Sequence, residues 1–269
     1  MRIDFHTHCF PDALAPRAME ILTKNCSARK NIRPHTNGTA ADTKRLLMKT
    51  GVSLAVVCNI ATNPHQEKNV NSFAISLKQQ DSFFYPLGSV HPDSTCMEKE
   101  IDRLKAAGIG GIKLHPDYVD ISVTDARFGR IFDLLEERDM FAVVHAGYDP
   151  VSPEDTHATP AMLREVMDKR PHLKLVAAHM GGFCEADDVL SHLVGTPIYL
   201  DTSLSSLRPD EQELLHRILK EHPTERILYG SDIPWSNAEK EVAFVENAPL
   251  TEAQKALIFE ENAKRLLKI

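Results

Sequence analysis

The sequence predicts a (β/α)8 barrel, the TIM-barrel fold, and three observations support this fold class. Eight short apolar segments alternate with amphipathic segments along the chain, and strands separated by helices pair in parallel. The length of 269 residues is close to the ~250 residues typical of this barrel. The first expected strand ends in HTHCFPD, without the glycine-rich loop that usually marks an open doubly wound sheet.

The expected strands are short runs rich in apolar and β-branched residues. On the first strand, FHTH places His6 and His8 on one face and turns Phe5 and Thr7 the other way. Such a pair suits a metal ion, although it is also found on ordinary surface strands. The eight strands are expected at residues 2–8, 53–60, 84–91, 110–115, 141–146, 173–179, 197–202 and 226–232.

The segments between the strands have apolar residues three and four positions apart, as in amphipathic helices. Thr159 and Pro160 have the pattern of a helix start, and Gly51, Gly108 and Gly195 stand where helices should end. The helices are expected at residues 39–51, 64–79, 95–108, 125–139, 159–171, 185–195, 209–223, 238–248 and 250–268. No linker or change in composition interrupts the series, so residues 1–269 are expected to form a single domain.

The loop after the first strand, residues 10–37, is long for a connection in a barrel and includes a helical stretch at 14–25. Long loops at this face are usually lids or specificity elements. Arg29, Lys30 and Arg33 could steer an acidic substrate towards the site, or could simply form a solvated basic turn.

Composition excludes several classes of function. The net charge is -7 and no cluster of basic residues stands out, so nucleic acid is not an expected partner. The longest apolar runs are far shorter than the ~20 residues of a transmembrane helix. Five cysteines without a CxxC pair indicate reduced thiols, and the amino-terminal residues lack the pattern of a signal peptide. We therefore expect a cytoplasmic protein without a membrane partner, and its composition is compatible with a homo-oligomer.

Ionisable side chains stand at the carboxyl ends of most expected strands, where a barrel carries its active site. A single histidine there is usually a hydrogen-bonded structural residue, but a whole set of buried ionisable groups needs partners or a metal ion. The set comprises His6, His8, His91, Lys113, His115, His145, His179 and Asp232. Imidazole and carboxylate ligands suit zinc and other divalent ions, which acidify a bound water for attack on a substrate.

Five motifs resemble the amidohydrolase superfamily, in particular its amidohydrolase-related branch, which includes aminocarboxymuconate-semialdehyde and resorcylate decarboxylases. They are DFHTH, GIGGIKLHP, VVHAG, AAHMGG and LYGSDIPW, which occur in the family's order over nearly the whole chain. The resemblance implies a distorted barrel of the metal-dependent hydrolase type. It also implies that His6, His8, His145 and Asp232 bind the metal, and that His179 polarises a carbonyl group or shuttles a proton.

The resemblance favours one Zn²⁺, with Mn²⁺ as the alternative. Some superfamily members bridge two metal ions with a carboxylated lysine, and Lys113 stands at the corresponding strand. The KLHP pattern is similar to the one-metal branch instead, in which such residues bind a substrate carboxylate, so a bridged second ion is not expected here.

Four further residues are candidates for substrate binding. His91 and His115 each precede a proline, which holds them extended at a strand exit. A turn histidine that binds nearby backbone groups is the alternative for both. Lys113 inside the barrel needs an anion, either a substrate carboxylate or Asp4 or Asp201. Trp235 lies just beyond Asp232 and is expected to form a wall of the pocket, or to pack its own loop.

The leading hypothesis is a hydrolase of a small carbonyl compound such as a lactone, an amide or a cyclic acid. Metal-activated water would attack, His179 would stabilise the oxyanion, and Asp232 would carry the proton to the leaving group. The alternative is a decarboxylase or hydratase of a small aromatic or muconate-type carboxylic acid. A metal-binding protein without catalysis is disfavoured, because this ligand set leaves a position open.

Overall fold

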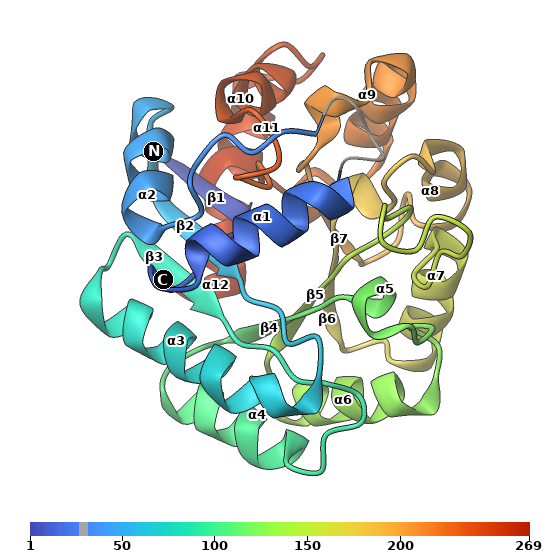
Figure 1. Ribbon diagram of the computed structural model, residues 1–269. Helices are drawn as coiled ribbons and strands as arrows, with labels where there is room; N and C mark the ends of the chain where they lie inside the picture. Colours follow the sequence, from blue (N-terminus) through green and yellow to red (C-terminus); the bar gives the residue numbers. More distant parts are fainter. Residues whose placement is uncertain (27–31) are drawn as a thin grey trace.

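The computed structural model describes residues 1–26 and 32–269, and within them eight parallel strands form a ring (Figure 1). One sheet has the order β1-β2-β3 and the other β4-β5-β6-β7-β8, so within each sheet every strand pairs with the next in the chain. Each strand lies within, or at most one residue outside, its expected segment. The strands are β1 (Arg2–Thr7), β2 (Val52–Cys58), β3 (Phe84–Leu87), β4 (Gly111–Leu114), β5 (Phe141–Val144), β6 (Lys174–Ala177), β7 (Tyr199–Asp201) and β8 (Ile227–Leu228).

Short contacts between the two sheets close the ring into a distorted (β/α)8 barrel. Gly88, just after β3, bridges to Ile112 of β4, and the N–H of Lys113 donates to the carbonyl of Gly88 at 2.9 Å. On the other side, the N–H of Phe5 donates to the carbonyl of Tyr229 at 2.7 Å, and Thr7 bridges to Ile233. The barrel expected from the alternating pattern is therefore confirmed.

The ring encloses an apolar interior. The rings of Phe5 on β1 and Phe141 on β5 lie 5.7 Å apart, and because these strands are not neighbours, the two rings meet across the barrel. The alternation expected for β1 is incomplete: Phe5 packs inside the barrel although His6 also faces the interior site. The pairing register of β1 shifts between Asp4 and Thr7, which breaks strict alternation.

Most of the helices surround the ring and bury their apolar faces against the outside of the strands. Thr159 caps its helix as expected, with its side chain accepting from the N–H of Met162, and Gly51, Gly108 and Gly195 have positive φ angles at helix ends. The helices are α1 (Ala15–Cys26), α2 (Ala40–Lys49), α3 (Glu67–Gln80), α4 (Met97–Ala106), α5 (Pro116–Val119), α6 (Ala126–Glu137), α7 (Pro160–Lys169), α8 (Ala186–His192), α9 (Gln212–Glu221), α10 (Ala238–Glu246), α11 (Glu252–Ala256) and α12 (Asn262–Leu267).

Two helical regions differ from the expectation. The single helix expected at 250–268 is divided into α11, a π-helical turn at Leu257–Glu261, and α12. The short helix α5, which follows His115 directly, was not expected. None of the helices in residues 1–26 and 32–269 combines the length and apolar character needed to cross a membrane.

Helix α1 belongs to the long loop after β1 and lies across the face of the ring in Figure 1. Its residues line the same cavity as the side chains at the strand ends. Helix α1 therefore forms part of the wall of this cavity, and the lid or specificity role of the loop stays a prediction.

Candidate metal centre

The carboxyl ends of the strands open into one cavity of about 820 Å³. Parallel strands end at the same edge of the ring, which makes residues distant in sequence neighbours. Trp235 lines this cavity. Of the eight side chains predicted at the strand ends, seven also line it: His6, His8, Lys113, His115, His145, His179 and Asp232.

Backbone hydrogen bonds hold the segment around Asp232 against the segment that contains His6 and His8. The N–H of Asp232 donates to the carbonyl of His6 at 2.7 Å, and the N–H of His8 donates to the carbonyl of Ile233 at 2.6 Å. Asp232 and His179 both have positive φ angles, 65° and 58°, a conformation that is strained for these residue types by about 1–3 kcal/mol. Such strain is typical of functional sites, where the surrounding fold imposes the geometry.

The hydrogen bonds of His6 and His8 determine which nitrogen of each faces the centre. Nδ1 of His6 lies 2.8 Å from Oδ2 of Asp201, and Nδ1 of His8 lies 2.9 Å from the carbonyl oxygen of Cys58. Because both partners can only accept, each Nδ1 carries the proton and donates it. Each Nε2 therefore presents a lone pair to the cavity, which is the form that binds a metal ion.

These lone pairs converge on Asp232. Its Oδ1 lies 2.9 Å from Nε2 of His8 and 3.5 Å from Nε2 of His6. Among the described residues this buried oxygen accepts no hydrogen bond. Two lone pairs that face a carboxylate oxygen repel one another unless a cation lies between them, so this donor set fits a divalent ion.

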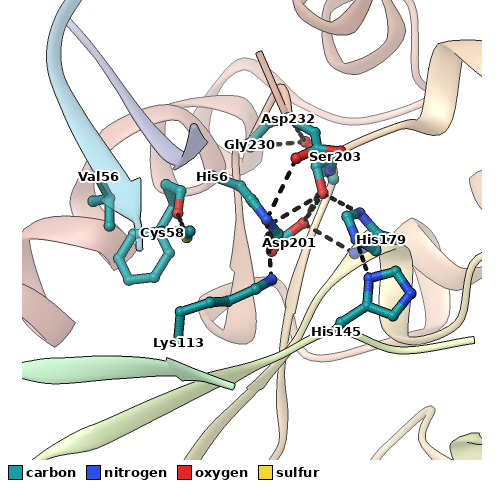
Figure 2. A network of polar contacts seen from close by, with 12 residues as sticks. His6, Val56, Cys58, Lys113, His145, His179, Asp201, Ser203, Gly230 and Asp232 are labelled. Atoms are coloured by element: carbon teal, nitrogen blue, oxygen red, sulfur yellow. Dashed lines mark hydrogen bonds and ion pairs between the residues drawn. The ribbon is translucent and has the colours of Figure 1, made fainter. Parts of the chain in front are cut away.

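The positively charged side chain beside Nε2 of His6 is that of Lys113 (Figure 2). Its Nζ lies 3.1 Å from Nε2 of His6, and the residue is only 1% exposed. Burial, reinforced by the charge of Lys113, lowers the pKa of His6, which keeps the imidazole neutral. Asp201, one of the two structural partners considered for Lys113, is instead hydrogen-bonded to His6.

His145 and His179 lie on the other side of the centre, with Nδ1 of His145 3.1 Å from Nε2 of His179. A tight backbone approach holds them together: a Cβ atom on Gly147 would come within 2.1 Å of the nitrogen of Phe183, so only glycine fits there. Burial lowers the pKa of both histidines well below the usual value. The neighbouring His115 lowers the pKa of His145 further, and His145 does the same to His179.

Asp201 and Ser203 orient His179 through a chain of hydrogen bonds. Nδ1 of His179 lies 2.7 Å from the hydroxyl of Ser203, which in turn donates to Asp201. Burial alone would raise the pKa of Asp201, but the charge and hydrogen bond of His6 outweigh it and lower this pKa to about 2. One carboxylate thus fixes the proton positions of both His6 and His179.

His115 belongs to a second group beside the first. Its ring stacks on Tyr118 at 3.8 Å and on His145 at 4.1 Å, both between ring centroids. Oδ2 of Asp149 lies 3.5 Å from Nε2 of His115 and 3.6 Å from Nε2 of His145. Burial would raise the pKa of Asp149, but the hydrogen bond and charge of His115 hold it below its usual range.

Three groups of side chains in the described part of the chain could each hold a metal ion: His6 with His8 and Asp232, His6 with His179 and Asp201, and His115 with His145 and Asp149. The first group has the lone pairs and the unpartnered oxygen described above. In the third, the planes of His115 and His145 differ by only 12°, so their in-plane lone pairs lie in two stacked planes, a poorer arrangement for binding one ion. The first group is therefore the better site. His145, the fourth predicted ligand, belongs to the third group, and its Nδ1 lies against Nε2 of His179.

The structure does not bring His91 to the cavity, whose lining among the described residues does not include it. Its Nδ1 accepts from the N–H of Asp93 at 3.1 Å, and its own N–H donates to Glu67. His91 is therefore the turn histidine of the alternative interpretation, because β3 ends at Leu87, four residues before it. Arg33 is exposed away from this lining, and Arg29 and Lys30 lie outside the described residues.

Sequence reasoning missed the site roles of Asp149, Ser203 and Tyr118, and assigned Asp201 a different partner. Asp149 and Tyr118 follow predicted site histidines by four and three residues, in VVHAGYD and KLHPDY. Asp201 ends β7 in YLDTS, the position at which the other strands place their site residues. That shared position was the signal that could have identified it.

The amino-acid sequence matches the family model described as Amidohydrolase over residues 3–269, and no curated protein sequence matches it. Solved structures share its fold at low identity. The 5-carboxyvanillate decarboxylase from Sphingomonas paucimobilis has a TM-score of 0.71 and 14% identity over 100% of this chain and 99% of its own.

Two other solved structures are similar over comparable lengths. A dihydroxybenzoic acid decarboxylase from Polaromonas sp. JS666, with bound manganese and the inhibitor 2-nitroresorcinol, has a TM-score of 0.71 and 16% identity, over 99% of this chain and 96% of its own. A probable 2-pyrone-4,6-dicarboxylic acid hydrolase from Acinetobacter baumannii, with citric acid bound, has a TM-score of 0.70 and 18% identity, over 100% and 99%. At these identities the likeness establishes the fold.

Proposed function

The chain belongs to the amidohydrolase family, and we propose that it is a metal-dependent decarboxylase of a small carboxylic acid. Lys113 is the observation that carries this proposal, because its ammonium group is buried beside His6, a predicted metal ligand. A buried cation needs an anionic partner, and a substrate carboxylate held next to the metal would supply one. Two of the three similar structures described above are decarboxylases of aromatic acids, which supports this choice over hydrolysis.

His6, His8, His145 and Asp232 would hold one divalent ion, Mn²⁺ or Zn²⁺. When bound, the ion supplies Lewis-acid chemistry that neutralises negative charge on the substrate. Manganese is bound in decarboxylase structures of the same fold, so we include it on equal terms with the zinc expected from the sequence. Asp149 faces Nε2 of His145, and we infer that in the metal-bound protein it keeps the proton there, so that Nδ1, which lies against His179 in this structure, would bind the ion.

Side chains of the protein would bind the substrate and supply the proton. Lys113 and His115 bind the carboxylate group, and Trp235 with Tyr118 forms walls of the cavity. Decarboxylation breaks the bond to the carboxyl carbon and leaves its electron pair on the substrate, so a proton must be added at the carbon that carried the carboxylate. His179 is placed to pass this proton from water to that carbon: Nδ1 carries its own proton towards Ser203, so Nε2 has a lone pair that can take up a proton and then release it.

The test is a screen of aromatic and muconate-type carboxylic acids for release of carbon dioxide by protein loaded with Mn²⁺ or Zn²⁺. With an active acid, Lys113→Met is expected to lower kcat/KM by at least about thirtyfold, corresponding to ~2 kcal/mol for one partner of a buried charge pair. Its metal content should equal that of the wild type, because lysine is not a ligand in the one-metal site.

Lys105→Met is the matched control, because Lys105 is an exposed residue of α4 and its loss should leave kcat/KM unchanged. Metal loss in Lys113→Met would contradict the proposed role and favour a carboxylated lysine that bridges two ions. Unchanged kcat/KM in Lys113→Met would remove the observation on which the proposal depends.

Hydrolysis of a lactone or cyclic acid is the second candidate, and Oδ1 of Asp232 favours it. This buried oxygen has no hydrogen-bond donor in the described part of the chain and could accept the proton of an attacking water. A probable 2-pyrone-4,6-dicarboxylic acid hydrolase has the same fold. Lactones added to the same screen test it: acid release from a lactone, without carbon dioxide from any of the acids, would select this candidate.

A further inference from the structure

We propose that the cavity contains a second, apolar compartment between α1 and α3, which binds the hydrocarbon body of a substrate longer than a single aromatic ring. This inference rests on the proposed function, because it assumes that the carboxylate end lies at Lys113. It specifies the substrate class: an amphiphilic carboxylic acid with an extended apolar part.

The cavity changes in polarity from its floor to its mouth. Its floor is formed by ionisable side chains that are almost completely buried, including His6, Lys113 and His179. Its outer walls are largely apolar and come from two helices and one loop. They include Leu14, Ile21 and Leu22 at α1, Val70 and Phe73 of α3, and Val151 of the loop after β5.

The apolar side chains at the mouth are unusually exposed. Six large apolar residues are exposed in the described part of the chain, and three of them line this cavity: Leu14 at 57%, Ile21 at 48% and Val151 at 40%. Apolar surface that gathers at one opening indicates a binding surface. The same cavity contains the buried ammonium of Lys113, so an acid that occupies both ends would satisfy the charge and cover the apolar rim.

The size of the cavity agrees with an extended ligand. Its volume of about 820 Å³ is in the upper part of the ~300–1,000 Å³ range of pockets for drug-sized ligands. A single ring bound at Lys113 would stay at the floor and leave the rim residues in contact with water. Arg17 and Asn25 also line the cavity from α1 and can remain solvated at its edge.

Isothermal titration of the Mn²⁺-loaded protein with butanoate, hexanoate, octanoate and decanoate tests the inference. These acids measure binding without turnover. We expect the affinity to rise by up to about fourfold for each added CH₂ group, as for the transfer of a methylene out of water. The double variant Leu14→Ser with Ile21→Ser should flatten this series by introducing polar groups where the chain would pack.

Met48→Ser is the matched control, because Met48 is 58% exposed and does not line the cavity, so the slope should equal that of the wild type. Equal affinities for all four acids would overturn the compartment while leaving acid binding at Lys113 intact. A slope that persists in the double variant would also overturn it, since the chain would then bind elsewhere. If no acid binds, the inference fails. The proposed function is tested separately, by comparing carbon dioxide release between the wild type and Lys113→Met.

Discussion

Two hydrogen bonds at Nδ1 make His6 and His8 suitable metal ligands, whereas their spacing in sequence provides only proximity. Asp201 accepts from His6, and the carbonyl of Cys58 accepts from His8. These partners lie on β7 and β2, far from the HTH motif in sequence. The chemistry of the site therefore depends on groups that stand behind the ligands and fix their protons.

Asp201→Asn tests this dependence. The asparagine amide can turn an N–H donor towards Nδ1 of His6, which would favour the wrong tautomer and leave Nε2 without its lone pair. The same change would disturb the hydrogen bond from Ser203, which orients His179. We expect the Mn²⁺ affinity to fall by about 10- to 100-fold, measured by competition with a chelator.

Asp210→Asn is the matched control for this measurement. Asp210 is exposed and does not line the cavity, so its replacement removes the same charge at a position that touches no ligand and should leave the Mn²⁺ affinity unchanged. Equal affinities for Asp201→Asn and Asp210→Asn would show that Asp201 does not prepare His6 for the ion.

The sequence predicted the residues that face the cavity better than the residues that orient them. His6, His8, His145, His179 and Asp232 were identified because they follow apolar strands and belong to recognisable motifs. The orienting roles of Asp201, Ser203 and Asp149 arise from contacts between different strands, which a single sequence does not reveal. His91 was placed wrongly for a related reason, since β3 ends earlier than its apolar run suggests.

At the scale of elements, all eight strands and the main helices follow from periodicity and capping residues. Strand ends were less predictable, because the last residues of each expected strand leave the sheet to form the site. β8 is the extreme case: only Ile227 and Leu228 remain of an expected seven-residue strand. The residues after them instead approach β1, with the N–H of Asp232 bonded to the carbonyl of His6.

Helix α10 contains a buried carboxyl group that should make stability depend on pH. Glu241 is 0% exposed and accepts hydrogen bonds from Ser206 and Ser236, which tie the loops after β7 and β8 to the helix. Burial raises its pKa from 4.5 to about 8. Between these values the folded protein keeps a proton that the unfolded chain releases, so this group's contribution to stability falls as the pH rises.

Glu241→Gln mimics the protonated acid and should remove this contribution to the pH dependence. Between about pH 5 and 8, the wild type should lose up to about 1.4 kcal/mol of unfolding free energy per pH unit through this group, relative to the variant. Urea unfolding across this range provides the comparison, with the exposed Glu239→Gln as the matched control. Parallel curves for wild type and Glu241→Gln would contradict the assignment.

At the scale of the whole molecule, apolar contacts across the barrel interior stabilise the strands that carry the site. Phe141 is 2% exposed and packs against Phe5 on the far side of the ring. Phe141→Ala should therefore lower the unfolding free energy by about 3–5 kcal/mol, the usual effect of removing a buried aromatic ring. Urea unfolding measures it, and Met48→Ala, at a position 58% exposed, should change stability by less than about 0.5 kcal/mol. Similar effects of the two substitutions would argue against a packed interior.

The central claim is the proposal that His6, His8, His145 and Asp232 hold one divalent ion. The most direct measurement is the metal content per chain. Metal-free protein is loaded with Mn²⁺ or Zn²⁺, excess ion is removed, and the bound metal is quantified by elemental mass spectrometry. We predict about one ion per chain in the wild type. Fewer than about one ion per two chains would contradict the metal centre, and with it the function proposed for this cavity.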